Sequence, residues 1–216
     1  KVKVNGVDDW ETGETLYEKN EGPMQSIEMD HDERYLYIKT TFDEAHKAWW
    51  NLQQFHLYFN IRDGKGIPVE TGAAAPFNAD FHLQIDGKES AHLLVAGDYD
   101  SFYYDYAERL EMIPESKEDI STVFHPIRLA LSKEFTRPDT GEVFPFSSYE
   151  TGVLQFGVAD PESEDYDSLN DYFYSEETGV LEIRIPWMLL NAKDPSRKEF
   201  AGDFWKEGLE SSITAE

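Results

Sequence analysis

The chain has 216 residues, of which 19 are Lys or Arg and 44 are Asp or Glu, so its formal net charge is −25. A field of this sign repels phosphate groups, which makes nucleic acid and anionic membrane surfaces poor partners. The absence of cysteine excludes disulfides, thiol nucleophiles and thiolate metal sites. No apolar run approaches the roughly 20 residues that a membrane-spanning helix needs, so no membrane insertion is expected.

Alternation of polar and apolar residues predicts strands along most of the chain. Residues 34–42, for example, are rich in aromatic and β-branched side chains and follow a polar turn. Asp86-Gly87 is a turn dipeptide between two such runs, which predicts a β-hairpin. The predicted strands are residues 34–42, 55–61, 79–85, 90–96, 152–158 and 179–185.

Helical patterns are confined to two short segments, residues 105–112 and 187–191. Four stretches are polar or rich in Pro and Gly and are therefore predicted to be long loops. These loops are residues 65–78, 113–122, 136–150 and 160–169.

Many short strands separated by turn signals favour an all-β fold: an antiparallel, jelly-roll-like β-sandwich with short helical turns. No interdomain linker is evident, so a single domain is expected over residues 1–216. The chain begins at Lys1 without a Met and stops at Glu216 without a clear ending. We therefore expect a fragment of a larger protein.

The tryptophans divide into expected core and expected surface. Trp187 follows Pro186 at the end of a predicted strand, and we expect it to be buried. Trp49, Trp50 and Trp205 lie in polar segments. Exposed indoles offer flat apolar faces to the C–H faces of sugar rings, so these three are the candidate carbohydrate-binding residues. Loop aromatics that merely cover the core remain the alternative.

An acidic cluster formed by Asp98, Asp100 and Asp105 is the candidate metal site. Calcium prefers hard oxygen ligands, which loop carboxylates and carbonyls supply. A solvated acidic surface remains the alternative, since the whole chain is acidic. The expected cofactor is accordingly a structural calcium ion.

No catalytic motif occurs: there is no Gly-x-Ser-x-Gly elbow, phosphate-binding Gly-rich loop or dinucleotide fingerprint. A glycan-active enzyme domain that uses carboxylates such as Asp80 and Asp98 stays open as an alternative. A structural or protein-interaction sandwich without a sugar site is the other alternative.

Four segments together resemble a family 9 carbohydrate-binding module, within the wider DOMON-like group of sugar-binding β-sandwiches. Residues 4–10, Val-Asn-Gly-Val-Asp-Asp-Trp, resemble the family's opening V-D-G-x-L-D-x-W, shortened by one residue. Residues 32–38 resemble its D-D-x-x-L-Y strand, and residues 55–63 are similar to its strand that ends in an acidic turn. Residues 181–187, Leu-Glu-Ile-Arg-Ile-Pro-Trp, resemble its late E-x-x-I-P-W signature. Residues 113–122 and 136–150 depart from the compact family pattern.

The resemblance implies a non-catalytic module that holds a sugar between aromatic side chains and carries structural calcium. By position, Trp49 or Trp50 resembles one platform residue and Trp205 a second. Such modules are accessory domains of glycan-active or surface proteins. The expected partners are therefore an oligosaccharide or polysaccharide and other domains of the parent chain, and the expected location is extracellular or at the cell surface.

Overall fold

The computed structural model describes residues 2–51, 53–70, 72, 75–114, 122–208 and 210–214. For six of these it describes the main chain only: Trp49, Asn51, Phe102, Asp105, Phe204 and Trp205. Antiparallel strands predominate among the described residues and the helices are short turns, so the fold is all-β and sandwich-like, as the sequence predicts. No described helix is long and apolar enough to cross a membrane.

The chain divides into two compact units. Unit 1 comprises Lys1–His56, Gln84–His92 and Val153–Leu190. Unit 2 comprises Leu57–Leu83, Leu93–Gly152 and Asn191–Glu216. Each unit is thus assembled from three separate segments of the chain. The single-domain organisation stays a prediction.

Unit 1 contains a five-stranded antiparallel sheet of order β1-β2-β3-β15-β14. Its strands are β1 (Glu14–Glu18), β2 (Met24–His31), β3 (Tyr35–Phe42), β14 (Tyr172–Ser175) and β15 (Val180–Pro186). Two 3₁₀ turns belong to the same unit, η1 (Lys47–Asn51) and η5 (Trp187–Leu190).

Strand β15 lies inside this sheet, between β3 and β14, and its residues 180–185 are all buried. Leu181, Ile183 and Ile185 point to one face, and Glu182 and Arg184 point to the other, because successive strand residues alternate. Both faces of this interior strand are covered, so the residues that point to either face are buried.

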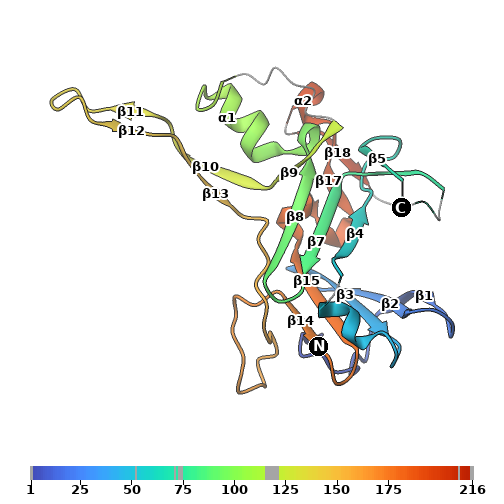
Figure 1. The fold of residues 1–216 in the computed structure, drawn as a ribbon. Helices are drawn as coiled ribbons and strands as arrows, with labels where there is room; N and C mark the ends of the chain where they lie inside the picture. The colour runs from blue at the N-terminus through green and yellow to red at the C-terminus, as the bar shows by residue number, and fades with distance from the viewer. Residues whose placement is uncertain are drawn as a thin grey trace. The chain divides into compact units, whose positions relative to one another are not determined.

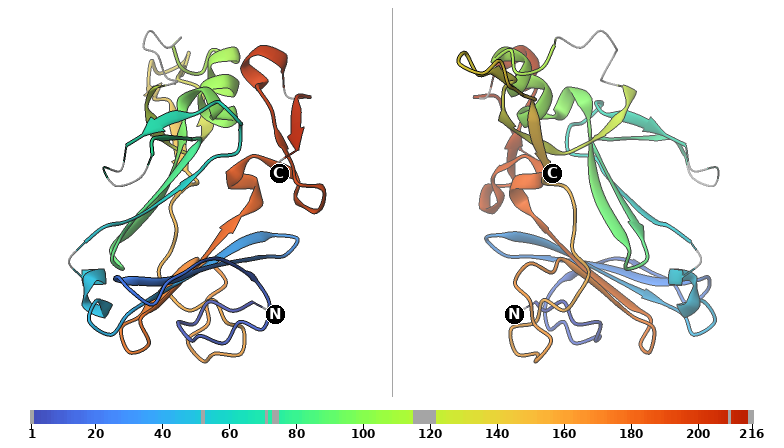
Figure 2. Two further views of the ribbon diagram at one scale, coloured as in Figure 1. Left: turned by 90° about the vertical axis from the view of Figure 1, so that its right-hand side faces the viewer. Right: turned by 60° about the vertical axis from the view of Figure 1, so that its left-hand side comes forward.

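The face of β15 that carries its charged residues is covered by the N-terminal segment. Val4 is fully buried there with Tyr37 and Ala159. The main-chain N–H of Ala159 donates to the carbonyl of Val4 at 2.8 Å. Figure 2 shows the N-terminal segment beside the loop between β13 and β14. The segment that resembles the family 9 opening is therefore part of the core of unit 1.

Glu182 fastens this N-terminal segment to the sheet. The main-chain N–H groups of Asn5 and Gly6 each donate to Glu182 Oε2 at 2.7 Å. Gly6 has φ +75°, and a Cβ at this position would lie 2.7 Å from Ser175 Cβ. Only glycine tolerates both the backbone conformation and this close approach. The bonds to Glu182 and the close packing against Ser175 thus give Asn5-Gly6 a structural role.

Unit 2 holds the greater part of a four-stranded sheet of order β4-β7-β8-β9 and several smaller sheets (Figure 1). The strands of the four-stranded sheet are β4 (Phe55–Phe59), β7 (Phe81–Asp86), β8 (Ser90–Ala96) and β9 (Phe124–Pro126). The paired strands of the smaller sheets are β5 (Ile67–Val69) with β6 (Phe77–Ala79), β10 (Arg128–Ser132) with β13 (Ser147–Glu150), β11 (Phe135–Thr136) with β12 (Val143–Phe144), and β16 (Ala192–Asp194), β17 (Glu199–Ala201) and β18 (Ser212–Thr214) together. The helical segments are η2 (Gly97–Tyr99), η3 (Ser101–Asp105), α1 (Tyr106–Arg109), η6 (Pro195–Arg197) and α2 (Phe204–Glu207).

The core of unit 2 follows the predicted alternation. Phe81 and Leu83 of β7, and Leu93 and Val95 of β8, are buried on one face of the sheet. The hairpin predicted at Asp86-Gly87 is confirmed, since β7 ends and β8 begins on either side of that turn.

Three predictions of local structure are wrong. Residues 65–78, predicted to be a loop, contain β5 and most of β6, which pair with each other. Residues 152–158 form no strand and make only isolated bridges, His92 with Val153 and Phe156 with Tyr172. Residues 136–150, predicted to be a loop, instead contain β12 and β13, which return along β11 and β10. Of the Pro and Gly residues that suggested a loop, Pro138 and Gly141 lie in the turn between β11 and β12, and Pro145 lies between β12 and β13.

Trp187 is half-buried rather than buried in the core. The strand ends at Pro186, and the 3₁₀ turn η5 then breaks the alternation that would have carried the indole inward. Leu190, at the end of that turn, is the residue that is buried. The Trp187 indole N–H instead donates to the carbonyl of Asp32 at 2.9 Å.

The burial of Glu182 predicts a specific pH dependence of stability. Burial raises the pKa of this carboxyl from 4.5 to about 7, despite the two main-chain donors. The folded state therefore binds a proton more tightly than the unfolded state, and stability due to this group is complete below about pH 4.5 and is lost as the pH rises through about 7. The Glu182→Gln variant lacks this loss, so its melting temperature relative to wild type should increase between these two pH values.

The exposed Glu14→Gln on β1 is the matched control, and its melting-temperature difference from wild type should vary little over the same range. A Glu182→Gln difference that does not change with pH would contradict the assignment.

Candidate functional site

Unit 1 contains a small cavity with a predominantly aromatic lining, which we call the aromatic cavity. Its volume is about 300 Å³, at the lower end of the range for small-ligand sites. Amide and imidazole groups accompany the aromatic rings. The lining residues are Pro23, Met24, Phe42, Trp50, Gln53, Gln54, Phe55, His56 and Tyr174.

The wall that carries Trp50 is positioned by two tyrosines of β14. Tyr172 and Tyr174 are two residues apart and so point to the same face of the strand. The Tyr174 hydroxyl donates to the carbonyl of Lys47 at 2.7 Å, which ties the turn η1 to the sheet. The Tyr172 hydroxyl donates to the carbonyl of Gly87 at 3.0 Å. Burial raises the pKa of both tyrosines to about 12, so both hydroxyls keep their protons at neutral pH.

The indole of Trp50 stacks on the ring of Tyr174, with 4.7 Å between ring centroids and 24° between ring planes. The rings of Phe156 and Tyr172 lie beside it at 6.4 and 6.2 Å. Trp50 is half-buried by these contacts. The indole is thus a fixed part of the wall, and its orientation is set before any ligand arrives.

Two exposed glutamines, Gln53 and Gln54, follow Trp50 in sequence and lie at the same cavity. Their amides provide both donors and acceptors. Apolar ring faces with a few polar planar groups at the edge are what a sugar ring requires, because its C–H face is apolar and its hydroxyl groups are not.

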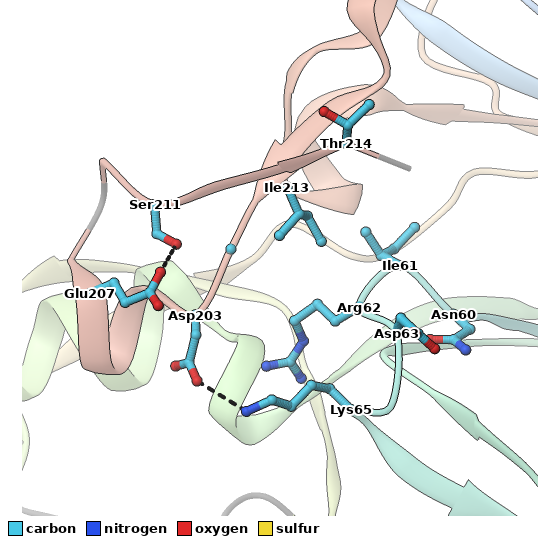
Figure 3. A pocket seen from close by; sticks show the side chains of 11 residues that line it. Asn60, Ile61, Arg62, Asp63, Lys65, Asp203, Glu207, Ser211, Ile213 and Thr214 are labelled. Atoms are coloured by element: carbon cyan, nitrogen blue, oxygen red, sulfur yellow. Dashed lines mark hydrogen bonds and ion pairs between the residues drawn. The ribbon is translucent and has the colours of Figure 1, made fainter. Parts of the chain in front are cut away.

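Unit 2 contains a second, polar cavity of about 770 Å³ (Figure 3). It lies between the turn after β4 and the segments around α2 and β18. We call it the polar cavity. Its lining residues are Asn60, Ile61, Arg62, Asp63, Lys65, Gly202, Asp203, Glu207, Ser211, Ile213 and Thr214.

Arg62 is the best-anchored of these residues. Its guanidinium Nε donates to Asp80 Oδ1 at 2.8 Å, and its two terminal nitrogens donate to Asp98 at 3.3 and 3.1 Å. The group also lies 4.1 Å from the ring centroid of Tyr99. Burial opposes the charge, but Asp98 and Asp80 outweigh it and raise the pKa of Arg62, which stays protonated.

Asp80 is fully buried, and both its oxygens are used. Besides the guanidinium bond to Oδ1, the main-chain N–H groups of Ile61 and Arg62 donate to Oδ2 at 2.8 and 2.7 Å. The carboxylate therefore fixes the turn that lines the polar cavity and does not face a ligand.

The cations of the polar cavity are balanced by carboxylates. Lys65 Nζ donates to Asp203 Oδ2 at 3.2 Å, while Arg62 is held by Asp80 and Asp98. Lysine at this distance lowers the pKa of Asp203, against the opposing effect of burial. A cavity whose cations already have carboxylate partners favours neutral polar ligands over phosphates.

Of the three predicted sugar-binding tryptophans, the structure describes the side chain of Trp50. Trp50 lines the aromatic cavity. Trp205 lies on α2, and the neighbouring Asp203 and Glu207 line the polar cavity. The side chains of Trp49 and Trp205 lie outside the described part of the structure, so their roles stay predictions.

The two predicted calcium ligands whose side chains are described, Asp98 and Asp100, accept hydrogen bonds from different groups. Asp98 accepts from Arg62, and Asp100 Oδ1 accepts from the main-chain N–H of Tyr103 at 2.9 Å. The side chain of Asp105 lies outside the described part of the structure. Among the side chains that the structure describes, no group of three or more His, Asp or Glu residues is arranged to hold a metal ion. Calcium at this cluster stays a prediction, which melting curves with added calcium and with a chelator would test.

Sequence reasoning missed most of the aromatic cavity. Phe42, Phe55 and Tyr174 were seen only as members of strands or not at all, although all three line it. Alternation along β3, β4 and β14 predicts which face of the strand each side chain occupies, but not which side chains it contacts. The hydroxyl bond from Tyr174 to the carbonyl of Lys47 has no sequence signal.

Comparison with protein-family models, with curated proteins and with solved structures gives no match. The functional conclusion therefore depends on the two cavities themselves.

The ion pairs of Arg62 with Asp80 and Asp98 predict a large loss of stability when Arg62 is replaced. Arg62→Met leaves Asp80 buried without its charge partner and should cost about 3–5 kcal/mol, as removal of one member of a buried ion pair does. Lys65→Met is the matched control, because the partly exposed pair with Asp203 should contribute less than about 1 kcal/mol. Urea denaturation measures both free energies of unfolding.

A double variant, Arg62→Met with Asp80→Asn, should recover part of the loss because no uncompensated carboxylate remains buried. Equal losses of unfolding free energy for Arg62→Met and Lys65→Met would contradict the prediction that the buried pair of Arg62 with Asp80 contributes more than the partly exposed pair of Lys65 with Asp203.

Proposed function

We propose that this chain is a non-catalytic carbohydrate-binding module that holds one neutral sugar ring in the aromatic cavity. The observation that carries the proposal is the fixed indole of Trp50, stacked on Tyr174 at the wall of a 300 Å³ cavity that also carries two glutamines. This cavity combines stacked rings with neutral amides.

The wall is prepared in advance for a ring-shaped ligand. A ligand that stacks on an immobile indole does not have to order it on binding, which lowers the entropic cost of binding. Gln53 and Gln54 supply hydrogen bonds to hydroxyl groups with no net charge. Both features fit a neutral sugar.

The charge of the chain narrows the sugar class. A net charge of −25 repels uronic-acid polymers, whereas neutral and cationic glycans approach without this penalty. Added salt should weaken the repulsion of acidic glycans and leave ring stacking nearly unchanged.

The resemblance to family 9 modules supports the same conclusion from another direction. Two of its segments, residues 4–10 and 181–187, meet in unit 1, where Glu182 accepts from the main chain of Asn5 and Gly6. A module of this kind acts as an accessory domain of an exported or surface protein.

The enzyme alternative finds less support. Its proposed carboxylates, Asp80 and Asp98, both accept from Arg62, and Asp80 is fully buried, so no substrate reaches it. A pair of carboxylates that acts on a glycosidic bond must instead face the bond from both sides.

Calorimetric titration with neutral glucan, xylan and mannan oligosaccharides tests the proposal, with a uronic-acid oligosaccharide as the negative control. Trp50→Ala should weaken binding about tenfold or more, because the stacking surface is lost. Gln54→Ala should weaken it about fivefold through one lost hydrogen bond, and since this residue is exposed the fold should be unaffected. Asn60→Ala, at the polar cavity, is the control and should leave the affinity unchanged.

Binding that is lost on Asn60→Ala or Trp205→Ala but survives Trp50→Ala and Gln54→Ala would move the site to the polar cavity. Absence of binding to every glycan would contradict the proposed function.

A further inference from the structure

A two-stranded extension of unit 2 gathers much of the exposed apolar surface of the described chain. It comprises residues 128–150, from the start of β10 to the end of β13, and we call it the arm (Figure 1). Its exposed large apolar residues are Leu129 (39%), Leu131 (59%), Phe135 (54%), Val143 (56%), Phe144 (46%) and Tyr149 (63%). Apolar patches of this kind on a soluble domain mark interaction surfaces.

The arm is a hairpin of two short antiparallel ladders, with a register shift in the β10–β13 ladder. Antiparallel pairs set Leu129 opposite Tyr149 and Phe135 opposite Phe144. At the turn the Arg137 guanidinium makes two bonds to Asp139, at 2.9 and 2.8 Å. An isolated two-stranded hairpin is only marginally stable in water, so a partner that covers the arm would stabilise it.

The arm is nearly neutral in a strongly acidic chain. Its 23 residues contain three basic and four acidic side chains, against 19 and 44 in the whole sequence. Self-association of this chain is opposed by charge repulsion everywhere else. The arm is therefore a surface at which two copies can approach with little local repulsion.

The charges of the chain argue against a lipid bilayer and against a basic protein as the partner of the arm. The turn carries Arg137, Asp139 and Glu142, and burying these charges disfavours insertion of the tip into a lipid bilayer. A basic protein would be drawn to the acidic remainder of the chain rather than to this neutral surface.

We infer that the arm is a self-association surface, on which the arms of two copies pack antiparallel about a two-fold axis. Lys133 and Glu134 are adjacent, at the break between the β10–β13 and β11–β12 ladders, and Lys133 Nζ lies 3.9 Å from Glu111 Oε2 in a solvent-exposed ion pair. An axis at this point sets each Lys133 against the partner's Glu134 in place of its exposed contact with Glu111, and the apolar residues of β10 and β13 meet those of β11 and β12 of the partner. A two-fold interface requires such self-complementarity.

Sedimentation equilibrium over a wide range of protein concentration tests the association. The weight-average mass of the wild type should rise toward twice the 24.9 kDa of one chain. Leu131→Ser and Phe144→Ser should each raise the dissociation constant about tenfold or more. Met188→Ser is the matched control, because this residue is 74% exposed but lies in unit 1, and it should change nothing.

A charge exchange tests the proposed axis. Lys133→Glu and Glu134→Lys should each weaken association of the single variant with itself, since like charges then meet across the axis. The double variant should restore it, and an equimolar mixture of the two single variants should associate as well as the wild type.

Added salt should strengthen wild-type association, because it screens the repulsion between the acidic surfaces. A chain that remains monomeric at every concentration and salt level would overturn the inference, as would association that all four arm variants leave unchanged. Sugar binding at the aromatic cavity is independent of either outcome.

Discussion

The hydrogen bond from the Tyr174 hydroxyl to the carbonyl of Lys47 is the constraint on which the aromatic cavity depends. Tyr174 is fixed by β14, and its bond holds the turn η1 so that Trp50 stacks on the tyrosine ring. Tyr172, from the same face of β14, adds a second ring beside the indole. A short strand thus determines where a loop tryptophan lies.

The strands that the sequence predicts correctly are those with strong alternation and a clear turn. The hairpin at Asp86-Gly87 is the clearest case, since β7 and β8 bury alternate residues on one face. Residues 152–158 alternate too but only bridge other segments, because alternation reports a half-buried extended chain rather than a paired one. Residues 136–150 of the arm were predicted to be a loop because they are polar and contain Pro and Gly. Strands as short as β12 and β13 have no distinct sequence signal.

The candidate site was only partly predictable from the sequence, because it depends on contacts between distant segments. Trp50 was identified from its polar surroundings, yet its half-buried state depends on tyrosines more than 100 residues away in the sequence. Glu182 was identified only as a residue of a predicted strand, and its bonds to Asn5 and Gly6 join segments that are 177 and 176 residues apart in the sequence. Contacts between distant segments decide both cases, and residue type alone does not specify them.

The indole N–H signals of the five tryptophans provide the most direct test of the central claim, that a sugar binds against Trp50. A two-dimensional ¹⁵N–¹H spectrum recorded during titration with a neutral oligosaccharide resolves these signals, and a Trp50→Phe variant assigns the relevant one. The account predicts that the Trp50 signal shifts and saturates with the ligand while the Trp10 and Trp187 signals stay in place. A saturating shift of another indole with Trp50 unmoved, or no shift of any indole, would contradict it.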